Sequence, residues 1–381
     1  MKQLSRISLF KLNDVSERIL KILKDLLYIS RNSLVIVNDH HRSTPTAKII
    51  NALRETGKLA CSVDFLIATG SHHPPSLEVA RKIAGAEKSD RIFLHDIRGA
   101  NEYSCAGKTS RETNVSYNSM LNKYERIITI GSVEPHYFAG FTGGAKSIFP
   151  GVAAYNSIEQ NHRWAMSEGS EILKTTRNPV FEDIWESANM IRPLKEIQSI
   201  QLVNDESSII SLSTGTLPEA FEEAKTSALK YYWRKVERKF DRIISYVKEP
   251  LNRDLYQSQK ALENCRSVLK PCGTIVLVSE CHEEVGLHSY FERLTQLGSP
   301  ENVMRNISFD NYRLGDHKAY KFAQLAMNAE LLYVGSLDSE TVSKAFMKKI
   351  DEHELVSLRS KWEKGGENIL IDKDGGFATY Y

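Results

Sequence analysis

The 381-residue sequence lacks any apolar run near the roughly 20 residues that a membrane-spanning helix needs. Its start, MKQLSRISLFKLND, has no uninterrupted apolar stretch and no small-residue cleavage site, which argues against a secretory signal. Its five cysteines include no C-x-x-C pair, so neither a disulfide framework nor a thiolate zinc site is indicated. We therefore expect a cytoplasmic protein with no membrane contact.

The sequence also lacks an excess of either charge. It has 50 basic and 48 acidic residues, for a net charge of +2, so the basic field of a nucleic-acid-binding protein is missing. The composition, 41% hydrophobic and 26% charged, excludes wholesale disorder. At roughly 100–200 residues per domain, we expect two or three domains.

Three common motifs are absent. There is no G-x-G-x-x-G of a dinucleotide-binding fold and no H-E-x-x-H of a zinc hydrolase. A glycine-rich segment does precede Lys146, but Ala145 stands immediately before the lysine, where a Walker A loop needs glycine.

Short apolar runs alternate with amphipathic helical patterns in the first part of the chain. The expected strands are 33–39, 63–70, 91–97 and 124–133, and the expected helices are 14–30, about 44–57 with Thr44 as N-cap, and 75–87. This alternation predicts a doubly wound, mainly parallel α/β sheet.

The same pattern restarts near residue 238. It predicts a smaller C-terminal α/β domain with strands at 240–247, 273–280 and 329–337 and a helix at 255–269. Residues 163–237 are expected to be mostly helical, with one strand near 199–205. We therefore predict an N-terminal domain over 1–237, a C-terminal domain over 238–345, and a tail, 346–381, that packs back on the N-terminal domain.

Histidines gather where the predicted strands of the first domain end. Ligands of open parallel sheets bind at these carboxyl ends. Imidazole suits proton transfer near neutral pH and is a common metal ligand, so the joint pattern predicts a site, although any one histidine could be structural. The histidines concerned are His40, His41, His72, His73, His95, His136 and His162.

The segment from Glu134 to Gly151 places four glycines around Lys146 after a strand. Such a backbone can approach a ligand closely, and the lysine could serve in covalent chemistry or phosphate binding; a flexible turn is the plain alternative. In the second domain, Gln257 and Lys260 are three residues apart and so share one face of the predicted helix. This face is either an exposed polar surface or a clamp for a substrate carboxylate.

Taken together and in order, these motifs make the chain resemble the nickel-pincer lactate racemase family from the first strand to the last. The matching elements are Asp39 to Arg42, Gly70-Ser71-His72, PHYFAGFTGGAK (135–146), Pro150-Gly151, Asn161-His162, and Tyr256-Gln257 with Lys260.

The resemblance implies two α/β domains with the active site between them. It implies a nickel pincer nucleotide, a pyridinium thioamide mononucleotide attached covalently at Lys146, with His162 as a metal ligand. His72 and His136 would be the catalytic acid/base pair. The other implied contacts are cofactor binding by Asp39, Ser147 and Gly151, and substrate binding by Arg42, Tyr256, Gln257 and Lys260.

The implied reaction inverts C2 of a 2-hydroxy acid by reversible hydride transfer through a 2-keto acid. Loading of the cofactor depends on biosynthesis proteins, so a preparation made without them would contain apo protein. His41 and Ser43 stand where the family commonly has threonine and proline, and His73 also departs from it. A larger or more polar 2-hydroxy acid is therefore as compatible as lactate.

Three alternatives stay open at this point: a nicotinamide-type 2-hydroxy acid oxidoreductase, a non-catalytic nucleotide- or metal-binding protein, and a zinc hydrolase. The sequence leaves the oligomeric state open, with a homo-oligomer as one option. It gives no sign of a nucleic-acid partner.

Overall fold

A computed structural model describes residues 28–191, 196–205, 208–376 and 378–380, which form two compact units. The larger unit contains residues 28–162 and Gly169–Tyr231, and the smaller contains Arg163–Glu168 and Tyr232–Tyr381. The helix expected at 14–30 lies, up to residue 27, outside the described residues. Among the described residues, no helix is both long and apolar enough to cross a bilayer.

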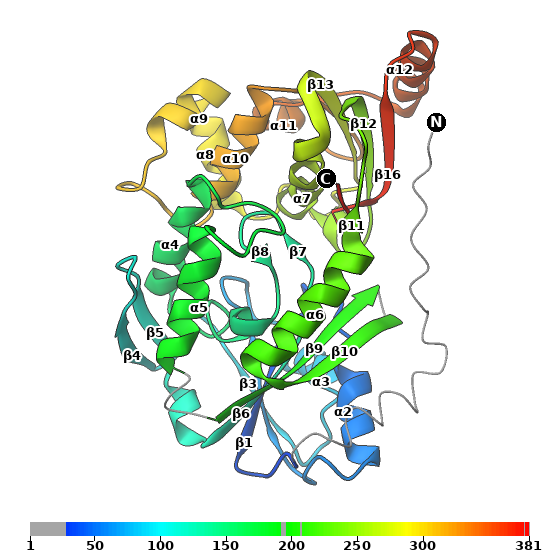
Figure 1. Ribbon diagram of the computed structural model, residues 1–381. Coiled ribbons are helices and arrows are strands. Elements are labelled where there is room, and N and C mark those ends of the chain that lie inside the picture. The colour runs from blue at the N-terminus through cyan, green and yellow to red at the C-terminus, as the bar shows by residue number, and fades with distance from the viewer. Residues whose placement is uncertain (1–27, 192–195, 206–207, 377, 381) are drawn as a thin grey trace. The chain divides into compact units, whose positions relative to one another are not determined.

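A six-stranded sheet, in the order β10-β9-β6-β1-β2-β3, forms the centre of the larger unit (Figure 1). All neighbouring strands are parallel except β10, which runs antiparallel to β9. The mainly parallel sheet predicted from the sequence is confirmed. The strands are β1 (Ser33–Asn38), β2 (Asp64–Ala68), β3 (Arg91–Leu94), β6 (Arg126–Ser132), β9 (Glu196–Asp205) and β10 (Ser208–Thr216).

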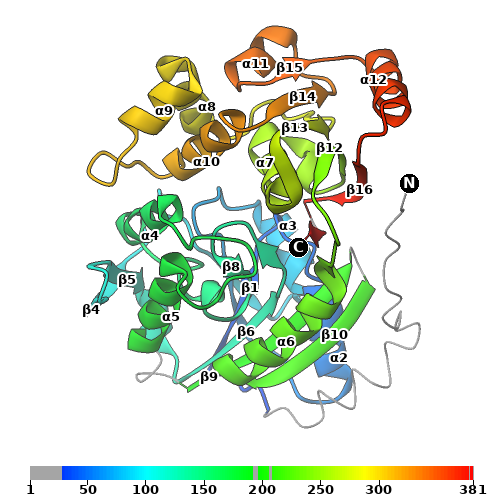
Figure 2. The same cartoon turned by 45° about the horizontal axis from the view of Figure 1, so that its top comes forward.

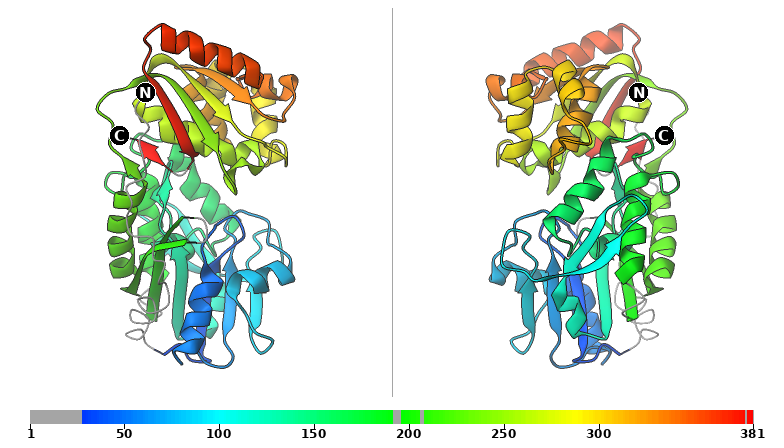
Figure 3. Two further views of the ribbon diagram at one scale, coloured as in Figure 1. Left: turned by 90° about the vertical axis from the view of Figure 1, so that its right-hand side faces the viewer. Right: turned by 90° about the vertical axis from the view of Figure 1, so that its left-hand side faces the viewer.

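Helices α2 (Thr46–Glu55) and α3 (Leu77–Ala84) pack on one face of this sheet, and α6 (Leu217–Tyr232) lies on the other (Figures 2 and 3). Covering both faces explains why β1 is apolar along nearly its whole length. Thr44 does not cap α2 as expected. Pro45 occupies the N-cap position, and the Thr44 hydroxyl instead bonds Asn38 and Ser132.

The region 163–237 is less helical than expected. It contains α5 (Pro179–Ile191) and α6, but β9 and β10 extend the sheet by two strands. The sequence of β10, SIISLSTGT, is rich in serine and threonine, which suits an edge strand but weakens the apolar pattern. A hairpin of β4 (Tyr103–Lys108) and β5 (Asn114–Asn118) was also not predicted.

The smaller unit contains a five-stranded sheet in the order β15-β14-β13-β12-β16, with every pair parallel. Its strands are β12 (Phe240–Val247), β13 (Leu269–Val278), β14 (Glu330–Val334), β15 (Lys348–Lys349) and β16 (Ile369–Gly375). Its helices are α7 (Leu255–Cys265), α8 (His288–Leu297), α9 (Pro300–Asn306), α10 (Asp316–Ala326), α11 (Ser339–Lys344) and α12 (Glu352–Lys364).

The C-terminal tail, which we expected to pack back on the N-terminal domain, contributes two strands. β16 pairs with β12 and so completes the smaller sheet, and β17 (Thr379–Tyr380) pairs with β11 (Trp233–Arg234). The apolar run NILI (368–371) fits a strand with a parallel neighbour, but composition alone does not specify which sheet it joins. The domain boundaries proposed from the sequence stay a prediction.

Candidate active site

A cavity of about 130 Å³ lies where β1, β2 and β6 end. This is the edge at which open parallel sheets bind ligands. The cavity brings together eight residues singled out from the sequence, although they come from separate segments of the larger unit. They are Asp39, Arg42, His72, His136, Lys146, Ser147, Gly151 and His162.

His72 is held by a buried carboxylate. Its Nδ1 lies 2.7 Å from an Oδ of Asp39, whose side chain is only 3% exposed. Burial acts to raise the pKa of Asp39, but the charge and hydrogen bond of His72, with the charges of His41 and Arg42, hold this pKa at about 2. Because the ionised carboxylate can only accept, Nδ1 of His72 carries a proton and Nε2 has the lone pair of the neutral ring.

His136 has the opposite arrangement. It ends β7 (Pro135–His136), which pairs with β8 (Gly140–Phe141) in a short hairpin, and its Nδ1 accepts a hydrogen bond of 3.2 Å from the backbone N–H of Ala139. Nδ1 therefore holds the lone pair, and Nε2 carries the proton of the neutral ring. When their rings are neutral, His72 thus presents a base and His136 a donor at Nε2.

His162 is the last residue of α4 (Tyr155–His162) and is 9% exposed. Burial, together with the nearby charges of Lys146 and His72, lowers its pKa to about 3, so the ring is neutral at physiological pH. Its Nδ1 lies 3.1 Å from Oδ1 of Asn161, whose amide nitrogen donates to Asp183. Nδ1 is therefore the protonated nitrogen, and Nε2 has the lone pair that a metal ion requires.

Lys146 lies in a short 3₁₀ helix (Gly144–Ser147) whose backbone requires glycine. Gly143 has φ 74°, and a Cβ there would lie 2.5 Å from Oε1 of Gln201. The same Gln201 oxygen accepts from the N–H of Gly144 at 3.0 Å. A Cβ at Gly151 would lie 2.4 Å from the carbonyl oxygen of Ser147. The glycines thus let the loop fold tightly at the cavity.

Arg42 is oriented by a polar chain that the sequence analysis missed. Its guanidinium lies 3.4 Å from Glu134, and Glu134 accepts a bond of 3.1 Å from Ser132. Thr44 connects Ser132 to Asn38. Asn38 and Ser132 are the last residues of β1 and β6, so their positions at strand ends were the available signal.

Four of the predicted histidines do not line the cavity: His40, His41, His73 and His95. His95 is fully buried, and its Nε2 is 3.0 Å from the carbonyl oxygen of Ala153; burial lowers its pKa to about 4. His73 is exposed and contacts Arg98. The interpretation that every strand end delivers a histidine to one site is therefore wrong for β3, whose histidine is His95.

Tyr256, Gln257 and Lys260 lie on the first turns of α7 in the smaller unit. Asp254 caps this helix by accepting from the N–H of Gln257 at 2.6 Å. The Nζ of Lys318 lies 3.5 Å from the ring centroid of Tyr256. The expectation that these residues and the cavity residues form one site between the domains stays a prediction.

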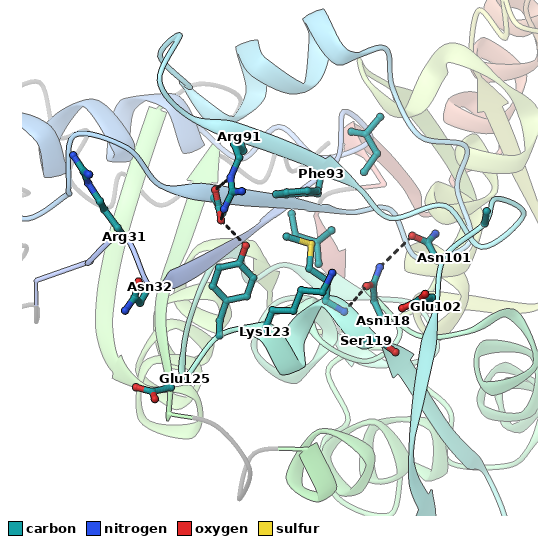
Figure 4. A pocket seen from close by; sticks show the side chains of 16 residues that line it. Arg31, Asn32, Arg91, Phe93, Asn101, Glu102, Asn118, Ser119, Lys123 and Glu125 are labelled. Carbon is teal, nitrogen blue, oxygen red and sulfur yellow. Dashed lines mark hydrogen bonds and ion pairs between the residues drawn. The ribbon is translucent and has the colours of Figure 1, made fainter.

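A larger cavity of about 840 Å³ contains none of the predicted site residues (Figure 4). It reaches the first residues of β2 and β3, Asp64 and Arg91, which are at the amino ends of the strands. Asp64 is bonded by Arg91, with Nε at 2.7 Å, and by Tyr124. Its one buried carboxylate is thus already satisfied, and the smaller cavity is the better candidate for an active site.

Family models match both parts of the chain. The "Lactate racemase N-terminal domain" matches residues 19–173, and the "Lactate racemase C-terminal domain" matches residues 237–368.

Curated relatives match over most of the chain. The lactate racemase of Thermoanaerobacterium thermosaccharolyticum is 26% identical over 376 residues, covering 93% of this chain and 86% of the relative. That of Lactiplantibacillus plantarum is 25% identical over 347 residues, covering 87% and 81%.

Solved structures share the fold. The lactate racemase apoprotein from T. thermosaccharolyticum superposes with a TM-score of 0.84 at 22% identity, covering 96% of this chain and 93% of that one. A Thermotoga maritima protein superposes with a TM-score of 0.76 at 16% identity, covering 96% and 97%.

Proposed function

Because this chain belongs to the lactate racemase family, we propose that it is a racemase or epimerase that inverts C2 of a 2-hydroxy acid. The observation that carries the proposal is that His72 and His136 line one cavity and differ at Nε2: in the neutral rings this nitrogen is unprotonated in His72 and protonated in His136. Inversion at a carbinol carbon needs a group that takes the hydroxyl proton and a second polar group for the other face.

The cavity residues fit a nickel pincer nucleotide. Lys146 offers an amine in a tight glycine loop, and His162 offers a neutral imidazole. The Ser147 hydroxyl is buried and has no hydrogen-bond partner among the described residues, so it is available to a bound group. Lys146 would tether the cofactor, His162 would bind its nickel, and Asp39, Ser147 and Gly151 would contact it. When bound, this cofactor supplies a reversible hydride acceptor, which allows a 2-hydroxy acid to become a planar 2-keto acid.

The remaining roles belong to the chain's own side chains. Nε2 of His72 takes the hydroxyl proton, and Asp39 stabilises the imidazolium that results. Nε2–H of His136 donates to the substrate oxygen. Arg42 binds the substrate carboxylate, because a guanidinium held by Glu134 is preorganised for a planar anion.

Tyr256, Gln257 and Lys260 complete the proposed carboxylate binding. Lys260 provides a cation and Gln257 an amide donor from one face of α7. Assigning them to the substrate rests on the family resemblance. The substrate class is a 2-hydroxy acid, with lactate as one member among larger or more polar ones.

The test uses the full chain co-produced with the cofactor's biosynthesis proteins. Intact mass should show a covalent adduct that Lys146→Arg abolishes, with one nickel per chain. The control Lys174→Arg, at a lysine that does not line the cavity, should keep both. Loaded protein should then racemise at least one of a panel of chiral 2-hydroxy acids, followed by polarimetry. An adduct-free protein, or loaded protein that inverts none of them, would contradict the proposal.

A further inference from the structure

A compact set of metal-binding atoms lies beside the cavity. One carboxylate oxygen of Asp39 and one ring nitrogen each of His40 and His41 lie within 4.8 Å of one another. The three residues follow β1 in a turn, where the backbone N–H of His41 donates to Oδ1 of Asp39 at 3.1 Å. The ring centroids of His40 and His41 are 4.2 Å apart.

The donor types favour a particular class of ion. Two imidazoles and one carboxylate suit divalent zinc, cobalt or nickel, whereas magnesium and calcium prefer oxygen ligands. Each carboxylate oxygen has two lone pairs, so the bonds from His41 and His72 leave acceptor capacity for a cation.

The cluster shares only Asp39 with the residues proposed to hold the pincer cofactor. Neither His40 nor His41 lines the cavity that contains Lys146 and His162. Asp39 is the one member that belongs to both. The adjacent cation, Arg42, is paired with Glu134, which partly balances its charge.

We propose that Asp39, His40 and His41 form a second metal site, for a divalent transition-metal ion of the zinc class. The remaining coordination positions would be taken by water. The site has a consequence if the proposed function holds. An ion on Asp39 would offset the carboxylate charge that stabilises His72 when it takes a proton, and the His41 ring lies 4.2 Å from the His72 ring. Zinc would then inhibit racemisation.

The binding test needs neither cofactor nor activity. Full-length, tag-free, chelator-treated protein is titrated with Zn²⁺ by calorimetry. His40→Gln and His41→Gln should each weaken one binding event by about tenfold or more, because even outer-shell changes cost metal sites that much. His73→Gln, next to His72 but outside the cluster, should bind as the original chain does, and so should His162→Gln.

Anomalous diffraction at the zinc edge should locate an ion on these three side chains. The proposal is overturned if the original chain binds no zinc or if the ion lies elsewhere. It is also overturned if His40→Gln and His41→Gln both keep the zinc affinity and the melting temperature of the original chain. Inhibition is measured separately on loaded enzyme and should be relieved in His41→Gln. If loaded enzyme racemises its substrate and binds zinc at this site without being inhibited, the proposed inhibition is overturned. A lack of racemisation without zinc counts against the proposed function alone.

Discussion

Nδ1 of His72 is 2.7 Å from the carboxylate of Asp39, and this contact fixes which nitrogen of the ring can act as a base. The carboxylate is nearly inaccessible and ionised, so it keeps Nε2 of His72 unprotonated in the neutral ring. The contact links two segments that are 33 residues apart in the sequence.

Asp39→Asn should lower kcat of loaded enzyme by about two to four orders of magnitude, the usual contribution of general acid–base catalysis. An amide can donate to Nδ1, which would place the proton on Nε2 and remove the base. Racemisation followed by chiral chromatography measures the effect. His73→Asn is the control, and equal losses in both variants would contradict a specific role for Asp39.

His72→Asn and His136→Asn should each reduce racemisation by about 10²–10⁴-fold. The two variants should differ in which antipode still gives 2-keto acid, because each removes the polar group on one face of the substrate. Quenched single-turnover analysis of the keto acid from each antipode tests this. Identical behaviour of both variants with both antipodes would argue against separate roles.

Gly143→Ala should destabilise the protein by about 1–3 kcal/mol and lower cofactor loading. The added Cβ would lie 2.5 Å from Gln201 and 2.7 Å from Val133, at a φ of 74°. Urea unfolding gives the free energy. Gly57→Ala is the matched control, since its φ is 65° but no atom lies within 4 Å of the new Cβ. Equal destabilisation would show that backbone strain, and not the crowded loop, sets the cost.

Stability should fall as the pH drops below about 6.5, by about 1.4 kcal/mol per pH unit for each buried neutral histidine. The unfolded chain binds these protons near 6.5, whereas the folded pKa is about 4 for His95 and about 3 for His162. Asp39 affects stability at lower pH. Its contribution to the free energy of unfolding is complete above pH 3.8 and is lost as the pH falls to about 2.

Urea unfolding at pH 7 and pH 5 tests this pH dependence. His95→Asn should reduce the difference in unfolding free energy between the two conditions, while His282→Asn, an exposed control, should not. An unchanged difference in His95→Asn would contradict the assignment.

The alternation of apolar runs and helices was enough to predict the parallel sheet, because β1, β2 and β6 are buried on both faces and carry little polar character. β10 and the β4–β5 hairpin were missed, since their half-exposed, polar sequences differ little from loops. The partner of β16 depends on contacts far apart in sequence, which composition does not encode.

The cavity residues were predictable because strand ends and an ordered set of motifs identify them. His95 shows the limit of that reasoning: it also follows a strand, yet its ring turns into the core and bonds Ala153. Glu134 and Gln201 were missed because their roles depend on Arg42 and Gly144, which only the folded chain brings to them.

The unequal hydrogen bonding of His72 and His136 has a consequence for the rate constants of the two mirror-image substrates. Mirror images have equal free energy in water, so the equilibrium constant of their interconversion is one, and kcat/KM must be identical in the two directions. A carboxylate behind one imidazole and a backbone amide behind the other cannot break that equality. The asymmetry can therefore change kcat and KM only in proportion to each other. The antipode with the higher kcat must also have the higher KM.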